Sequence, residues 1–583
     1  MNTRTRFLLA FGAAALGLGL ATAAPQPAKA FCGFYVAGAD SQLFNGATMV
    51  VMMRDGKRTV LAMQNEYQGP VSDFALVVPV PVVLSEDNVK TLPKAVFDRV
   101  DKLSAPRLVE YWEQDPCNPW VETKGRGGGL PLPAPTAMAE EEDSADYGVK
   151  IEAQFTVAEY EIVILSASDS TGLDSWLRDN DYQIPAGAEP LLRPYVQDGM
   201  KFFVAKVDAS KVEFARRPDG SKRAMLSPLR FHYDSDQFAL PIRLGLINAP
   251  PDGQSGAGDQ AGAQDLLVHV LARGKRYQVA NYPNVPIPTN LEVKDAVRDR
   301  FAHFYVSLFD HTLKQHPKAV VTEYAWSAST CDPCPEPALT LAELVTLGAD
   351  VLPAYAGKLD GKQIDADLEW SVPSEFVLTR LHARYDQSSL GEDLVFEEAP
   401  GIAGGREFMQ TNGQLERGSQ PSSENQFQAR YIIRHPWTGA IACNDPQPGV
   451  WGGPPSNPHA KPQPTVAREL TTVDRRASLG SFVTKDSQAL LGLTATEMQG
   501  SSGSWGEQLG VQPATDAPPP EQATPNKKPP SPAGEAATKD QQQASSGGCR
   551  CALGETPADG LGSIGIGLLT LLTLAGVRRR DPN

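Results

Sequence analysis

The chain has 583 residues and a formal net charge of −16, from 53 Lys and Arg against 69 Asp and Glu. An acidic balance argues against nucleic-acid binding as the main task, and against docking on an anionic membrane through a basic face. With 41% hydrophobic residues the chain can bury a core, and at about 150 residues per domain its length allows two to four domains.

Residues 1–30 have the pattern of a secretory signal peptide. Arginines at positions 4 and 6 precede an apolar run over 7–20, and the triplet 28–30 (Ala-Lys-Ala) is the small-x-small pattern after which a signal peptidase cleaves. We expect cleavage between Ala30 and Phe31. An uncleaved anchor helix is the alternative, but the apolar run is short for a bilayer span.

A first strand-rich α+β domain is predicted over 31–248. Strands over 49–53 and 59–63 flank an Asp-Gly turn typical of a hairpin. The apolar run 74–84 contains Pro79 and Pro81, which favours an edge or bulged strand. Further strands are expected at 160–165, 201–207 and 237–247. Helices are expected at 94–103 and after a capping-box variant, Thr171-x-x-Asp174. The Gly-, Pro- and Glu-rich stretch 124–148 indicates a flexible insertion.

A second α+β domain is predicted over 265–445, after a Gly- and Ala-rich joint. Strands are expected at 265–271, 376–385 and 428–433, and the longest helix at 290–314. Thr340-x-x-Glu343 forms a capping box, which places a helix start near Leu341. Strands outnumber helices and do not alternate with them regularly. The predicted fold class is therefore α+β, with mixed or antiparallel sheets and a few helices.

The C-terminal part predicts a spacer and a sorting signal. Residues 446–548 are rich in Pro, Gln and Ser, as in a linker. In the tail 549–583, Cys549 and Cys551 precede a 17-residue apolar segment (561–577) and then three arginines. This order resembles the myxosortase-type sorting tail of myxobacteria and their relatives. The resemblance implies that Cys549 or Cys551 is processed or lipidated, and that the protein is exported and held at the cell surface. A plain transmembrane anchor helix is the alternative.

The other five cysteines are candidates for structural disulfides: Cys32, Cys117, Cys331, Cys334 and Cys443. Five cysteines can form two bridges in 15 ways, so sequence does not choose the pairing. Cys331 and Cys334 enclose only Asp-Pro and can close a local ring. The same CxxC motif could also be a redox centre, but such a site usually starts a helix, and here Pro335 and Pro337 separate the motif from the expected helix. Zinc is a third interpretation, and it lacks a second ligand pair nearby.

Several segments together resemble a known bacterial family. They are FCGFYV (31–36), MVVM (49–52), MQNEY (63–67), FALVVPVP (74–81), CDPC (331–334) and WGG (451–453). They are similar to the secreted family called domain of unknown function 2330, over about 31–455. The resemblance implies a secreted, surface-located, uncharacterised protein and supplies no catalytic residues.

The sequence therefore leaves three functional hypotheses. The first is a surface-anchored structural or binding module of the envelope, and the second an envelope thiol-disulfide oxidoreductase using Cys331 and Cys334. The third is a hydrolase without a recognised motif. No nucleophile-elbow, P-loop or zinc-protease motif occurs, so we expect no catalytic residue set, no metal site and no cofactor, and an enzyme is the less favoured reading. The expected partners are the membrane, through the tail, and two processing enzymes, signal peptidase and the sorting protease.

Overall fold

The computed structural model describes residues 34–36, 44–45, 48–64, 67–68, 75–118, 148–180, 182, 187–208, 210–216, 222–248, 264–359, 366–385, 389–407, 415–467 and 477–499. These residues all belong to one compact unit. The predicted signal peptide, most of the insertion 124–148 and the tail 549–583 lie outside the described residues. No helix in the described part is long and apolar enough to span a bilayer.

The largest sheet, which we call the central sheet, is mixed. Its strands run in the order β24, β23, β25, β20, β21, β16, β3, β4, β14, β7, with β18 beside β20. Strand β16 is parallel to β3, with Val268 opposite Val50, and antiparallel to β21. The bounds are β3 Thr48–Asp55, β4 Arg58–Gln64, β7 Val89–Thr91, β14 Leu229–Asp234, β16 Gln264–Arg273, β18 Asn284–Pro286, β20 Val320–Ser327, β21 Phe376–Tyr385, β23 Ile402–Gly404, β24 Ser419–Pro421 and β25 Gln426–Gln428.

The two ranges predicted as domains both supply strands to this sheet. Strands β3, β4, β7 and β14 come from 31–248, and β16, β20 and β21 come from 265–445. The predicted hairpin is present: Asp55 pairs with Arg58, and Gly56 at the turn has φ +58°, a conformation that favours glycine.

A second, antiparallel sheet has the order β1, β6, β11, β10, β9. The bounds are β1 Phe34–Val36, β6 Ala75–Val80, β9 Val149–Val157, β10 Tyr160–Ala167 and β11 Lys201–Val207. The expectation of an edge or bulged strand is wrong for β6, because β1 and β11 flank it and neither pairing contains a register shift. In the described part of the chain, β1 pairs with Ala75–Val77, and Pro79 lies opposite Phe202 of β11.

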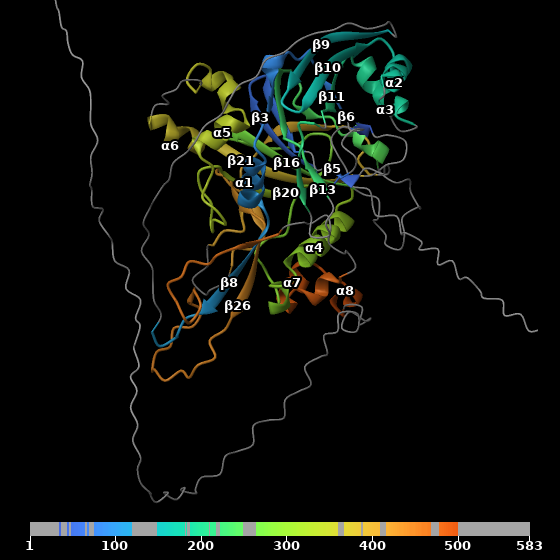
Figure 1. Cartoon of the computed structure of the whole chain (residues 1–583). Helices are drawn as coiled ribbons and strands as arrows, with labels where there is room; N and C mark the ends of the chain where they lie inside the picture. The colour runs from blue at the N-terminus through green and yellow to red at the C-terminus, as the bar shows by residue number, and fades with distance from the viewer. Residues whose placement is uncertain are drawn as a thin grey trace, which may run out of the picture. The chain divides into compact units, whose positions relative to one another are not determined.

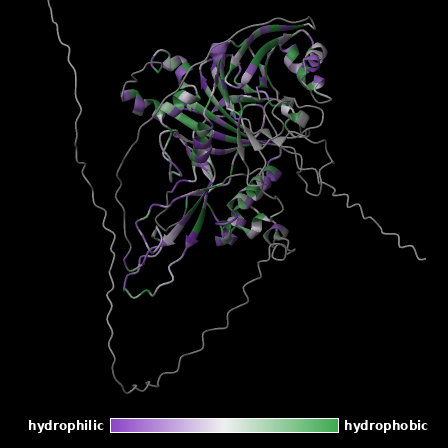
Figure 2. Ribbon diagram, in the orientation of Figure 1, coloured by the Kyte–Doolittle hydropathy of each residue, from purple (hydrophilic) through white to green (hydrophobic). Residues whose placement is uncertain are grey.

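The two sheets pack face to face, and helices cover their outer faces (Figure 1). Val50 and Met52 of the central sheet meet Leu76 and Phe203 of the second sheet in an apolar cluster. Helices α2 (Ser170–Asp179) and α3 (Glu189–Gln197) cover the second sheet, and α1 (Lys94–Ser104), α5 (Leu341–Leu347) and α6 (Ala366–Glu375) cover the central sheet. Hydrophobic residues accordingly gather in the strands of the two sheets (Figure 2). The predicted α+β class is confirmed.

A further region is built around helix α4 (Phe301–Gln315) and a small sheet. The small sheet has the order β19 (Leu291–Glu292), β26 (Arg430–His435), β8 (Arg107–Glu113), β27 (Trp451–Gly452), with β28 (Thr465–Val466) also beside β8. Phe304 of α4 packs against Tyr431 and Phe482. Helices α7 (Lys485–Leu490) and α8 (Ala495–Gln499) follow. The remaining strands form minor sheets: β2 Phe44–Asn45, β5 Tyr67–Gln68, β12 Glu213–Arg216, β13 Lys222–Met225, β15 Ala239–Leu240, β17 Arg276–Val279 and β22 Leu394–Ala399.

Three further local predictions are wrong. The helix expected over 290–314 begins only at Phe301, because Leu291 pairs with Tyr431 in a sheet and Asn290 has φ +55°. The strand expected over 237–247 is confined to β15, and a 3-10 helix follows over Arg243–Asn248. Helix α2 is capped by Asp169, whose carboxylate accepts from the Gly172 N–H, two residues before the expected cap.

Candidate functional site

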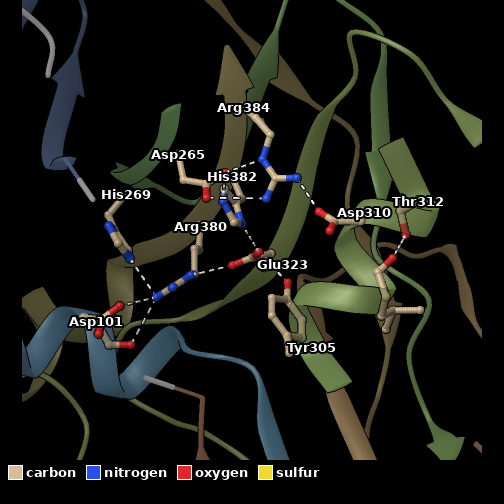
Figure 3. Close-up of polar contacts among 11 residues, drawn as sticks. Asp101, Asp265, His269, Tyr305, Asp310, Thr312, Glu323, Arg380, His382 and Arg384 are labelled. Carbon is tan, nitrogen blue, oxygen red and sulfur yellow. Dashed lines mark hydrogen bonds and ion pairs between the residues drawn. The ribbon is translucent and has the colours of Figure 1, made fainter. Parts of the chain in front are cut away.

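A network of charged side chains lies at the middle of the central sheet, between helices α1 and α4 (Figure 3). Strand β21 contributes Arg380, His382 and Arg384 at alternate positions, so they share one face. Strand β20 contributes Glu323, and β16 contributes Asp265. Positive and negative groups alternate through this network, and we call it the buried ion network.

Glu323 reaches the network because its strand contains a β-bulge. Thr322 is opposite Leu381 and Tyr324 is opposite Arg380, so Glu323 is the extra residue of β20. A bulge redirects a side chain and is often retained for that effect. The Glu323 carboxylate is fully buried and accepts from three groups: Arg380 Nε at 2.6 Å, the Tyr305 hydroxyl, and His382 Nδ1 at 2.7 Å.

Arg380 joins the sheet to helix α1. Its Nη1 lies 2.5 Å from Asp101 Oδ1, while its Nε donates to Glu323. Burial works to lower the pKa of this guanidinium, but the two carboxylates outweigh burial and raise it. Arg380 Nη1 also lies 3.4 Å from Nε2 of His269, whose pKa is held well below its usual value by burial and by the nearby Arg380 charge.

His382 lies between two carboxylates. Its Nδ1 contacts Glu323, its Nε2 lies 3.3 Å from Asp265 Oδ1, and the Phe309 ring stacks on it with centroids 3.8 Å apart. Burial works to lower the pKa of His382, but Glu323 and Asp265 outweigh burial and raise it. Burial also opposes ionisation of Glu323, but His382 and Arg380 lower its pKa to about 2.

Arg384 completes the network toward helix α4. Its Nε donates to Asp265 Oδ1 at 2.7 Å, and its Nη1 pairs with Asp310 of α4. The network therefore ties both α1 and α4 to the sheet. Glu323, Arg380 and His382 are 0%, 1% and 3% exposed, so a substrate cannot reach them. No group of three or more metal-ligating side chains occurs in the described part of the chain.

The described cysteines form two disulfides. Cys117 is bonded to Cys443 and Cys331 to Cys334. Strands β8 and β26 are parallel neighbours, and Cys117 and Cys443 follow them in the chain, which explains how residues 326 positions apart in sequence meet. The other predicted site residues, Cys32, Cys549, Cys551, Ala30 and Phe31, lie outside the described residues.

The Cys331–Cys334 loop is held in place from several sides. Arg107 Nη1 donates to the Pro333 carbonyl at 2.8 Å, and Gln428 Nε2 donates to the Asp332 carbonyl. Arg99 of α1 pairs with Glu336 at 2.8 Å. Helix α5 begins at Leu341 with the Thr340–Glu343 capping box, as predicted, so neither sulfur lies in its first turn.

The burial of Arg107 and of the Glu407 carboxyl, both near this loop, could not be predicted from the sequence. Arg107 is fully buried and donates to the carbonyl oxygens of Leu103, Ala105 and Pro333, and burial lowers its pKa to about 10. Burial and the adjacent Asp332 carboxyl raise the pKa of Glu407, which accepts from the Tyr111 hydroxyl at 3.0 Å. Neither Glu407 nor Asp332 is among the described residues that line the pocket of about 380 Å³ beside α4, and these residues include no Asp or Glu.

Comparison with known proteins gives one match. A bacterial family described as an uncharacterized protein conserved in bacteria (DUF2330) matches residues 26–397. This range starts near the beginning of the expected resemblance and ends before its expected limit of 455. No curated protein and no solved structure matches the chain.

Proposed function

This chain belongs to the DUF2330 family of uncharacterized bacterial proteins, and we propose that it is an exported protein anchored at the cell surface. Its folded part would serve as a structural or binding module of the envelope. The predicted signal peptide and the predicted sorting tail support export and anchoring.

The Cys117–Cys443 disulfide is the observation that carries this proposal. Structural disulfides persist in oxidising compartments and are rare in the cytosol of most bacteria. The bond joins distant parts of the sequence at the ends of adjacent strands, where it fixes the small sheet. Such a cross-link suits a protein that must stay folded outside the cell.

The buried ion network supports a structural role more than a catalytic one. Each cation of the network has a carboxylate partner, and Glu323, Arg380 and His382 are almost completely shielded from solvent. A catalytic acid or base needs access to substrate. The network is better suited to fixing two helices on the sheet.

Mass spectrometry of the native protein from its own membranes, without reductant, tests this proposal. We expect an N-terminus at Phe31, an end near Cys549 with added mass, and a peptide pair linked through Cys117 and Cys443. A cytosolic chain that keeps residues 1–30 and carries free thiols at Cys117 and Cys443 would refute it. The same chain produced without residues 1–30 is the matched control, since it should remain in the cytosol with both thiols reduced.

A second candidate function is thiol–disulfide exchange at Cys331 and Cys334. It is favoured by the exposure of Cys334 and by the Arg107 cation at the loop, since a nearby cation stabilises a thiolate. In this reaction the Cys331 and Cys334 thiols would pass two electrons and two protons to a partner disulfide, which becomes two thiols while Cys331 and Cys334 form a disulfide. Insulin reduction with dithiothreitol as the electron source tests it: activity abolished by Cys334→Ser but kept in Cys443→Ser supports the candidate, and inactivity of the unaltered chain excludes it.

A further inference from the structure

A pocket of about 380 Å³ lies at the end of helix α4. His311 and His316, from the last turns of this helix and its cap, form one wall. The segment 286–291, Arg417 and the end of α7 supply the other walls. The volume falls in the range of about 300–1,000 Å³ that is usual for small-molecule sites.

The polar lining of this pocket favours an anion. Arg417 is exposed, and among the described residues it has no hydrogen-bond or ion-pair partner. The side chain of His316 is also exposed and without a partner in that part of the chain. The described residues of the lining include no Asp or Glu, although the whole chain carries a net charge of −16. Arg417 therefore gives this wall a local positive charge in an acidic protein.

Two nearby negative groups do not cancel this preference. The carboxylate of Glu416, next to Arg417 in sequence, is bound by Arg406 through Nε at 3.0 Å and through Nη2. The C-terminal end of α4 carries about half a negative charge from the helix dipole, less than the full charge of Arg417.

The other walls are apolar and partly open to solvent. Leu490 lines the pocket and is 54% exposed, so it offers apolar surface to a bound ligand. Leu291, Leu491 and two prolines add further apolar surface. His311 shapes this wall, because its Nε2 lies 3.2 Å from the Leu491 carbonyl oxygen. Apolar walls with a few polar groups are typical of ligand sites.

We propose that this pocket binds a small organic anion with an apolar body, such as a medium-chain carboxylate. The carboxylate would bind at Arg417 and His316, and the apolar body would lie against Leu490 and Leu491. This inference rests on the proposed binding role and names its ligand class.

Isothermal titration calorimetry of the full-length chain with octanoate tests the proposal. We expect octanoate to bind, and octylamine and octanamide to bind at least about tenfold more weakly, because only the carboxylate makes a charge-assisted bond to Arg417. Arg417→Gln should weaken octanoate binding about tenfold, and Arg417→Lys should recover part of the loss. Leu490→Asp should abolish binding by placing a negative charge on the apolar wall.

Lys461→Gln is the matched control, since it removes one exposed positive charge outside the pocket lining and should leave the affinity unchanged. Circular dichroism of each variant verifies folding. Equal binding of octanoate and octylamine, equal affinities of Arg417→Gln and Lys461→Gln, or no octanoate binding at millimolar concentration would each overturn the proposal. Binding to a chain that proves cytosolic would refute export and leave the pocket assignment standing.

Discussion

The two faces of strand β21 are both buried, yet they are stabilised in different ways. Leu381, Ala383 and Tyr385 point into the apolar cluster between the two sheets. Arg380 and His382, at the alternate positions, point into the buried ion network. Strand β21 therefore separates a core that is stabilised by burial of apolar surface from a core that is stabilised by paired charges.

The two faces of β21 therefore differ in the substitutions that they tolerate. Apolar packing is non-directional, so the loss of one side chain removes its own area and leaves a cavity. In a buried ion network each charge is stable only while its partners remain. The loss of one group therefore leaves the others buried without a counter-charge. The charged face also joins α1 and α4, which are about 200 residues apart in sequence, to the same strand.

Glu323→Gln should have the largest effect. The substitution keeps the size of the side chain but leaves Arg380 with Asp101 alone and His382 with Asp265 alone. We expect the free energy of unfolding to fall by about 3–5 kcal/mol, as when one partner of a buried ion pair is removed. Urea unfolding of the full-length chain, followed by circular dichroism, measures it.

The same substitution at an exposed pair is the control for Glu323→Gln. Glu398 pairs with Lys275, and both side chains are more than half exposed. Glu398→Gln should lower the free energy of unfolding by at most about 1 kcal/mol, since surface ion pairs contribute little. Equal effects of the two substitutions would show that the charged face is not a distinct kind of core.

Leu381→Ala tests the apolar face of the same strand. Leu381 is almost fully buried between the sheets, so we expect a loss of about 2–4 kcal/mol from transfer and cavity terms. The loss should be the same at pH 6 and pH 8, because no titrating group is removed. A cost that changed with pH would mean that the two faces of β21 are coupled.

Many of the strands and turns of the central sheet can be predicted from the sequence. The hairpin of β3 and β4, the bounds of β21 and the start of α5 follow from apolar periodicity, an Asp-Gly turn and a capping box, all of which are local signals. The helix expected over 290–314 fails because its first residues pair with β26, more than 130 residues away. Apolar spacing cannot report a partner that distant.

The candidate site was less predictable than the fold. Arg-x-His-x-Arg at 380–384 gives a recognisable alternation of charge in an apolar strand, and this signal could have indicated a polar face. The partners could not be found in this way, because Asp101 and Asp310 are ordinary acids on helices and Glu323 depends on a bulge. The cysteines are visible in the sequence, whereas the pairing of Cys117 with Cys443 depends on the parallel contact of β8 and β26.

His382→Gln should have the smallest of the three effects, and the one most dependent on pH. Because Glu323 and Asp265 raise the pKa of His382 in the folded state, its stabilising contribution is complete below the unfolded value of about 6.5. The contribution is lost as the pH rises through the folded pKa. We therefore expect a cost of about 2 kcal/mol at pH 6, from hydrogen bonds to charged groups, and a smaller cost at pH 9.

The pH series is best kept above pH 5. The pKa of Glu323 is lowered to about 2, so its contribution is present above its unfolded value of 4.5 and is lost as the pH falls toward 2. His316→Gln, at an exposed position, is the control and should show a small cost at every pH. A cost of His382→Gln that grew with rising pH would mean that His382 is neutral in the folded protein, and the charged face of β21 would then depend on its arginines alone.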